Sequence, residues 1–301
     1  METKSRYFSP EVLQKIAHME LRARMVAEGF YAGMHKSNAR GFDVEFLEHR
    51  EYSPGDDLRH VDWKLFGKSD KYFVKQYAAE SSLRAHIIID SSASMRFGKN
   101  QNGETKLDYA SLLSVALAYL LLKQGDAVGM IAFDLGTLEM IEPRAAREHL
   151  YRILTALETC PAGAETAIAP ILAAFSANLK RRSLIILISD LLDDQEKVIQ
   201  TLKVMKGAGH ELAVFHILDE EEVEFPFSRA TRFVDMETGQ TLTADAIAVR
   251  TEYKRNLAEF LNRYRRFCRD SGMEFVSTTT SMPVEKLLLE FLTKREMRKR
   301  T

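Results

Sequence analysis

The sequence predicts an α/β protein, with a doubly wound, mostly parallel sheet that carries helices on both faces and a small N-terminal α+β extension before it. Three observations predict this class. From about residue 84, short apolar runs alternate with longer segments of helical periodicity, the pattern of successive strand–helix units. After its first residue, the run Ser183–Ile188 is apolar throughout, as in parallel strands covered on both faces. The 301 residues, 46% of them apolar, are enough to bury one large core.

The first 80 residues lack the alternation of apolar runs and helical segments that marks the rest of the chain. We therefore expect an extension over 1–80 and a sheet domain over 81–301. Ser9 and Pro10 are residue types that favour an N-cap and a first helical turn, and they predict a helix that continues to about Glu28. The polar, turn-rich stretch that follows is interleaved with aromatic residues. It predicts two short strands, Glu45–Tyr52 and Lys71–Ala78.

The sheet domain is predicted to alternate strands with helices. The predicted strands are His86–Asp90, Ala127–Phe133, Leu138–Glu142, Ser183–Ile188, Leu212–Leu218 and Glu274–Ser277. The predicted helices are Leu107–Lys123, Arg144–Leu157, Ala167–Leu179, Gln195–Lys206, Arg250–Arg269 and Val284–Met297. A polar, hairpin-like excursion is expected near 221–243. In doubly wound sheets, ligands bind beyond the carboxyl ends of the strands, where the strand order reverses, so functional residues are expected there.

Polar residues follow two of the predicted strands. Asp90, Ser92 and Ser94 alternate as Asp-x-Ser-x-Ser, so an extended loop would point all three side chains the same way. The long apolar strand also ends in a carboxylate, Asp190, and Thr166 lies in a loop that precedes a helix. If the two strands are neighbours, both carboxylates project into one crevice.

Two carboxylates and three hydroxyls are hard oxygen donors that suit a small dication, Mg²⁺ or Mn²⁺. The carboxylates would neutralise the ion, the hydroxyls would leave it electrophilic, and one coordination position would stay open. That position suits a carboxylate from a partner protein. The alternative is that Asp90 and the serines only cap the following helix and bind nothing.

The pattern resembles the metal-ion-dependent adhesion site of von Willebrand factor A domains. This resemblance implies an octahedral metal ion held, directly or through water, by Asp90, Ser92, Ser94, Thr166 and Asp190. Each of these positions has the residue type that the motif requires. The resemblance also implies a von Willebrand A-like arrangement of the sheet.

A second resemblance covers almost the whole chain. It rests on the runs HKS, EFLEHREYSPGDDLRHVDW, FVKQYAAES and IIIDSSASM, on the segment Asp235–Gly239, and on the ending TTTSMPVEKLLLEFLTKR. These runs resemble the bacterial family called domain of unknown function fifty-eight. The resemblance implies a von Willebrand A-like core after an N-terminal extension and association with a MoxR-type AAA+ ATPase. It implies an adaptor or chaperone-system component, not an enzyme.

A competing interpretation is a metal-dependent phosphohydrolase that uses the same crevice. A carboxylate at a strand end can act as a nucleophile. Aspartyl-phosphate phosphatases have a second acidic residue two positions later, where this chain has Ser92. No general acid follows Asp90 and no lysine is obviously placed, so we expect a binding module without catalytic residues.

Charge narrows the class of partner. The chain has 42 basic and 43 acidic residues and a formal net charge of -1, which excludes a globally basic nucleic-acid binder. The basic ending Lys294–Arg300 lacks aromatic residues for base stacking, so it is interpreted as a solvated surface. No apolar run has the length of a signal peptide core at the N-terminus or of a membrane span, so we expect a cytoplasmic protein.

A dense polar cluster, Asp56–Trp63, surrounds the single tryptophan of the chain. We interpret it as an ion-pair and turn network that fixes the extension to the sheet domain, because arginine–carboxylate pairs hold irregular backbone well. The alternative is a docking surface.

Overall fold

The structure is a computed structural model that describes residues 46–51, 72–77, 83–98, 100, 103–133, 138–146, 148–160 and 168–299. The predicted N-terminal helix, the Asp56–Trp63 cluster and Thr166 lie outside the described residues. Two strands of the predicted extension are described, β1 (Phe46–Glu51) and β2 (Phe73–Tyr77). They pair antiparallel as a two-stranded sheet of their own.

The central sheet has six strands in the order β10-β7-β6-β3-β4-β5. Their bounds are β3 (Arg84–Asp90), β4 (Ala127–Phe133), β5 (Leu138–Arg144), β6 (Leu184–Ser189), β7 (Glu211–Leu218) and β10 (Glu274–Thr279). All neighbours run parallel except β5, which pairs antiparallel with β4. The strand order reverses between β3 and β6. This is the mostly parallel, doubly wound sheet that the sequence predicts.

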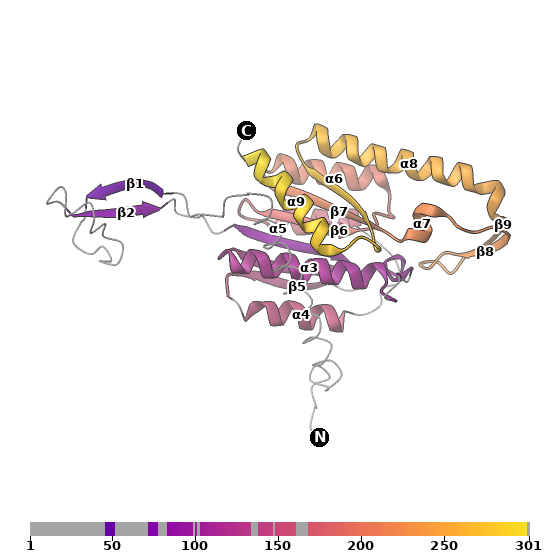
Figure 1. Cartoon of the computed structure of the whole chain (residues 1–301), viewed down its shortest axis with the longest axis horizontal. Coiled ribbons are helices and arrows are strands. Elements are labelled where there is room, and N and C mark those ends of the chain that lie inside the picture. The colour runs from indigo at the N-terminus through magenta and orange to yellow at the C-terminus, as the bar shows by residue number, and fades with distance from the viewer. Residues whose placement is uncertain are drawn as a thin grey trace, which may run out of the picture.

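Helices cover both faces of this sheet (Figure 1). One face carries α3 (Lys106–Lys123), α4 (His149–Thr159) and α9 (Val284–Lys299). The other carries α5 (Ile168–Asn178), α6 (Gln195–Gly207) and α8 (Ala246–Asp270). Side chains alternate along a strand, so on β3 Ile87 and Ile89 pack on the first face and Ile88 on the second.

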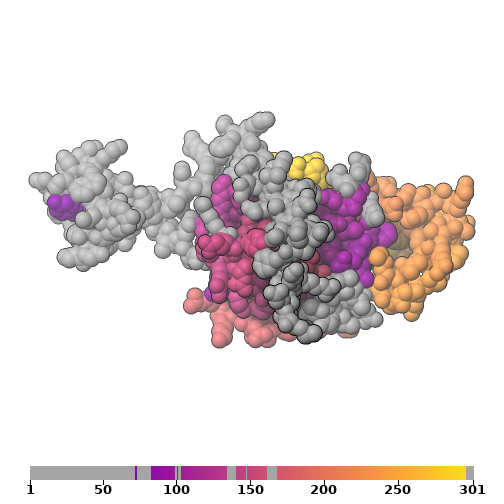
Figure 2. All heavy atoms as spheres, turned by 90° about the horizontal axis from the view of Figure 1, so that it is seen from below, coloured from indigo at the N-terminus to yellow at the C-terminus, as the bar shows by residue number. Residues whose placement is uncertain are grey.

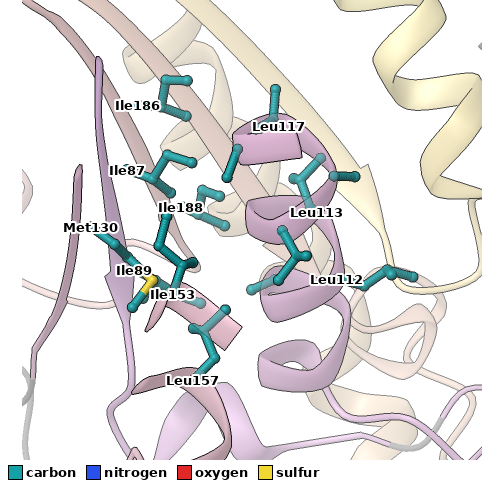
Figure 3. Close-up of a cluster of buried hydrophobic side chains, with 14 of the residues drawn as sticks. Ile87, Ile89, Leu112, Leu113, Leu117, Met130, Ile153, Leu157, Ile186 and Ile188 are labelled. Carbon is teal, nitrogen blue, oxygen red and sulfur yellow. The ribbon is translucent and has the colours of Figure 1, made fainter. Parts of the chain in front are cut away.

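The first face contains the larger buried cluster. Figure 3 shows Leu113 and Leu117 of α3 turned toward the isoleucines of β3 and β6. Nearly every residue of α3 up to Leu122 is buried, which fits its mainly apolar sequence. Thr105 and Asp108 close its N-terminus with a reciprocal capping box. This rigid layer fixes where β3 and β6 end.

The predicted start of the helix at Arg144 was wrong, because β5 continues through Pro143 and Arg144, and α4 begins only at His149. A strand can contain proline where no ladder bond is required, as on this edge strand. The close approach of β5 also explains Gly129 of β4. A Cβ atom on Gly129 would lie 2.6 Å from the Ile141 carbonyl oxygen.

Between β7 and α8 the chain forms a short helix, α7 (Glu220–Glu224), and a hairpin of β8 (Ala230–Val234) and β9 (Thr241–Asp245). We call α7 and this hairpin the arm. The rings of Phe225, Phe227, Phe233 and Tyr253 pack together and join the arm to α8. Figures 1 and 2 show the arm at one end of the molecule. None of the helices in the described ranges has the length and apolar character of a membrane span.

Candidate functional site

The first predicted ligand, Asp90, is the last residue of β3 and lies where the strand order reverses. β3 and β6 are parallel neighbours, with Ile89 opposite Ile188. The strands therefore end at the same edge of the sheet. Asp90 at the end of one strand meets Ser189 and Asp190 at the end of the other, at the position where doubly wound sheets bind ligands.

Asp90 is surrounded by donors that carry no charge. The Ser92 backbone N–H donates to Asp90 Oδ1 over 3.0 Å, and the Ser189 hydroxyl donates to Oδ2 over 2.7 Å. The Ser92 and Ser94 hydroxyl oxygens lie 3.0 Å apart. Asp90 and Ser92 are fully buried, and Ser94 is 8% exposed. Three of the five predicted ligands thus lie together.

The expected extended loop was wrong, however. Ala93 has helical dihedral angles, and a 3₁₀ turn, η3 (Ser94–Arg96), begins directly after it. The hydrogen bond from the Ser92 N–H to the Asp90 side chain favours this turn over an extended path. The two serine hydroxyls meet because the loop turns, not because it alternates.

The electrostatics of Asp90 indicate an excess of negative charge. Burial, together with the charge of Asp190, raises the pKa of Asp90 from 3.8 to about 7. Hydrogen bonds from Ser189 and Ser92 oppose this rise without cancelling it. A cation beside Asp90 and Asp190 would relieve both the burial cost and the repulsion.

The second predicted carboxylate, Asp190, has a different partner. The Lys106 ammonium group donates to Asp190 Oδ2 over 2.8 Å, and both side chains are fully buried. The same ammonium donates to Glu222 Oε1 over 2.9 Å. Burial alone lowers the pKa of Lys106, but the charges of Asp190 and Glu222 outweigh it and raise the pKa above its ordinary value. Lys106 is therefore a charged ammonium ion inside the site.

His216 of β7 holds the backbone at Asp190. Its Nε2 lies 3.0 Å from the Asp190 carbonyl oxygen, and its Nδ1 lies 3.3 Å from the Ser277 hydroxyl. Burial lowers the pKa of His216 to about 4, so the ring is neutral at pH 7. Because a carbonyl can only accept, Nε2 carries the proton and Nδ1 accepts from Ser277.

The loop after Asp190 also anchors α5. The N–H groups of Ile168 and Ala169, at the start of α5, point to Asp193 Oδ2 at 2.9 and 3.4 Å. Leu191, buried between these anchors, has a φ of 57°, a conformation that costs energy for a side chain of this kind. Thr166 lies two residues before α5, outside the described residues, so its place as a ligand stays a prediction.

Sequence reasoning missed four residues that shape the site: Lys106, Ser189, His216 and Glu222. The expectation that no lysine is placed near the carboxylates was wrong. One signal was available, since Lys106 stands in the first turn of α3, where the helix macrodipole disfavours a cation. A lysine there indicates a partner elsewhere. Its partner Asp190 is 84 residues away, which no local pattern reveals.

The donors fit a small hard dication. Asp90, Asp190, Ser92 and Ser94 offer carboxylate and hydroxyl oxygens, which Mg²⁺ and Mn²⁺ prefer. Within the described ranges, no group of three or more His, Cys, Asp or Glu side chains could hold a metal ion, so a site here depends on the hydroxyls. Two buried carboxylates that repel each other at one edge of the sheet favour a cation beside them.

The chain is similar to several known proteins. The family model described as "Protein of unknown function DUF58" matches residues 48–262. Uncharacterised proteins of Mycobacterium bovis and Mycobacterium tuberculosis are each 26% identical over 278 residues, covering 90% of this chain and 86% of theirs.

Solved structures are similar at lower identity. BatB from Bacteroides thetaiotaomicron is 16% identical, with a TM-score of 0.47 over 70% of this chain and 98% of its own. The SpRpn10 VWA domain is 12% identical, with a TM-score of 0.41 over 68% and 93%. Manganese-loaded Plasmodium vivax TRAP is 13% identical, with a TM-score of 0.34 over 45% and 57%.

Proposed function

The chain belongs to the DUF58 family of proteins of unknown function, and we propose that it is a metal-dependent protein-interaction module. In this proposal Asp90, Ser92, Ser94, Thr166 and Asp190 hold Mg²⁺ or Mn²⁺, directly or through water. An acidic side chain of the partner takes the open coordination position. The partner that we propose is a MoxR-type AAA+ ATPase.

One observation carries the proposal: two fully buried carboxylates from neighbouring strands interact at the reversal point of the sheet, with two hydroxyls beside them. A buried charge is costly unless it is compensated. Asp90 has only uncharged donors, so it lacks that compensation in the structure described here. The helix-capping alternative does not account for the repulsion between Asp90 and Asp190.

Lys106 does not remove the need for a cation. Asp90, Asp190 and Glu222 carry three negative charges when ionised, and Lys106 carries one positive charge. Two negative charges remain, which one dication would balance. The negative charge of Glu222 thus balances the positive charge of Lys106. The net charge of the site is the same as that of Asp90 and Asp190 alone.

When bound, the ion supplies a Lewis-acidic position that attracts a third carboxylate. The chain's own groups orient and shield that position. Ser92 and the Asp190 loop are held by buried hydrogen bonds, which favours one fixed geometry. Among the described ligands Ser94 is the most exposed, so we expect the partner to approach on its side.

The first test is calorimetric titration with Mg²⁺ and Mn²⁺. We expect weak binding at one site, loss of the heat signal in Asp90→Ala, and no change in Asp270→Ala, which removes an exposed carboxylate at the end of α8. Equal binding by Asp90→Ala and the wild type would place the metal elsewhere.

The second test is capture of a purified MoxR-type ATPase. We expect capture in Mg²⁺, weaker capture in EDTA, and weaker capture by Ser92→Ala in Mg²⁺. Neutralising Lys294 and Arg295 of the basic ending should leave capture unchanged. If capture is indifferent to both chelator and Ser92→Ala, the metal is not the contact, and the Asp56–Trp63 cluster becomes the better docking candidate.

A further inference from the structure

We infer that Lys106 is an internal cation that competes with the metal ion for Asp190 and links the occupancy of the site to α7 of the arm. This inference rests on the proposed metal site. It adds to that proposal a residue that sets metal affinity and a route by which binding changes a distant surface.

The competition follows from which oxygens are taken. The ammonium of Lys106 lies 2.8 Å from Asp190 Oδ2, so it already occupies one of the two carboxylate oxygens. Among the described residues, the other oxygen, Oδ1, accepts one long hydrogen bond of 3.3 Å, from the Leu192 N–H. A dication near Asp190 would repel the ammonium in a buried site where water screens little.

Apart from Asp190, one charged group of the described residues accepts a hydrogen bond from the ammonium. Lys106 is fully buried and has no solvent to move into. Besides Asp190, its hydrogen-bond acceptor is Glu222 Oε1 at 2.9 Å, and the ring of Phe97 lies 5.8 Å from Nζ. A shift away from Asp190 is therefore a shift toward Glu222. The two carboxylates share one cation, and a metal ion would leave that cation to Glu222.

Glu222 is the residue that holds α7. Its second oxygen, Oε2, accepts the Asp219 N–H over 2.7 Å in the capping box that begins the helix. Its carbonyl oxygen accepts the Tyr253 hydroxyl over 2.8 Å. Tyr253 packs on Phe225, with ring centroids 4.6 Å apart. A stronger ion pair between Lys106 and Glu222 would therefore affect the capping box, the aromatic cluster and the base of the hairpin.

Asp219 gives α7 a fixed starting point. It is buried, it accepts from the Thr280 hydroxyl over 3.0 Å, and Gly98 packs directly on it. A Cβ atom on Gly98 would lie 2.1 Å from Asp219 Oδ2, so no spare room exists there. Changes at Glu222 therefore act on the rest of α7 and the arm and cannot be absorbed at Asp219.

The first experiment measures metal affinity. Calorimetric titration with Mg²⁺ compares the wild type with Lys106→Met and with Lys203→Met, which removes an exposed lysine of α6 as a matched control. We expect Lys106→Met to bind on the order of ten-fold more tightly, with the control unchanged. Lys106→Gln, which keeps a hydrogen-bond donor but no charge, serves as a second variant should Lys106→Met fold poorly.

The second experiment measures the link to the arm. Hydrogen exchange of the amides in α7 and the β8–β9 hairpin is followed with and without Mg²⁺. We expect Mg²⁺ to slow exchange there in the wild type and to have no such effect in Glu222→Gln. Glutamine is accepted at this position of a capping box, so this variant removes the charge that holds the ammonium and keeps the cap.

The outcomes separate the two proposals. Binding with equal affinity in the wild type and both Lys106 variants overturns the competition and leaves the metal site standing. Tighter binding in the variants with unchanged or faster arm exchange in the wild type overturns the link to α7. Absence of Mg²⁺ binding in the wild type and in every variant overturns the metal site itself, and Lys106 is then a structural ion only.

Discussion

Asp90 and Asp190 are both fully buried carboxylates at the ends of neighbouring strands, yet their charges are compensated in different ways. Asp90 receives a backbone N–H and a hydroxyl, and its pKa rises to about 7. Asp190 receives a buried ammonium that it shares with Glu222. Asp190 therefore has a cation beside it, whereas Asp90 has none among the described residues.

The stability of the protein should therefore respond differently to substitutions at the two carboxylates. A paired buried charge is destabilised when its partner is removed, whereas an uncompensated one is relieved when it is neutralised. Loss of the Lys106 charge beside the end of β6 should therefore destabilise the fold. Loss of the Asp90 charge at the end of β3 should stabilise it. Three substitutions examine this contrast.

The largest effect is expected from Lys106→Met without metal. Removal of the ammonium leaves Asp190 as a buried charge with no cation, so the free energy of unfolding should fall by about 3–5 kcal/mol. Urea unfolding in EDTA measures this, with Lys203→Met expected to stay within about 0.5 kcal/mol of the wild type. Equal losses in the two variants would show that the ion pair contributes nothing beyond an exposed charge.

The opposite sign is expected from Asp90→Asn. Because the pKa of Asp90 is raised from 3.8 to about 7 in the folded state, the wild type loses stability as the pH rises through that window. Asn cannot ionise, so in EDTA the variant should be more stable than the wild type by about 1–3 kcal/mol at pH 8. The gain should vanish near pH 4. A loss of stability at pH 8 would instead make Asp90 a structural cap.

A smaller effect is expected from His216→Leu, which removes the hydrogen bond to the Asp190 carbonyl. The loss should be about 1–2 kcal/mol at pH 7. The pKa of His216 is lowered from 6.5 to about 4, so the wild type loses stability as the pH falls from 6.5 toward 4. The variant should lose less over that range. Urea midpoints at pH 7 and pH 4.5 compare them, and parallel curves would contradict a neutral buried ring.

The sheet could be predicted because its signals are local. β4 has the predicted bounds, Ala127–Phe133, and β6 differs from Ser183–Ile188 by one residue at each end. The predicted helix near 250–269 is longer in the structure, from Ala246 to Asp270. The five residues of α7 were not predicted, since a single turn of consecutive glutamates lacks an apolar stripe.

Of the candidate site, only the residues that directly follow a predicted strand could be predicted. Asp90 and Asp190 follow apolar runs, so their meeting could be inferred from the sheet alone. Glu222 carries no such mark, because its role depends on a partner far away in the chain. The place of Lys106 in the first turn of a helix indicates that the lysine has a partner, but not which one, since Asp190 lies 84 residues away.

The segment between β3 and α3, together with the start of α3, contacts parts of the chain that are synthesised much later. Asn100 donates to the Thr280 carbonyl, 180 residues later, and Lys106 reaches Glu222, 116 residues later. Contacts of such long sequence separation carry a high loop-closure cost, which slows folding. During synthesis, Asp90 and its serines leave the ribosome long before β10 can complete the last of these ties. Residues as far along the chain as Thr280 must therefore be present before this edge of the sheet is closed.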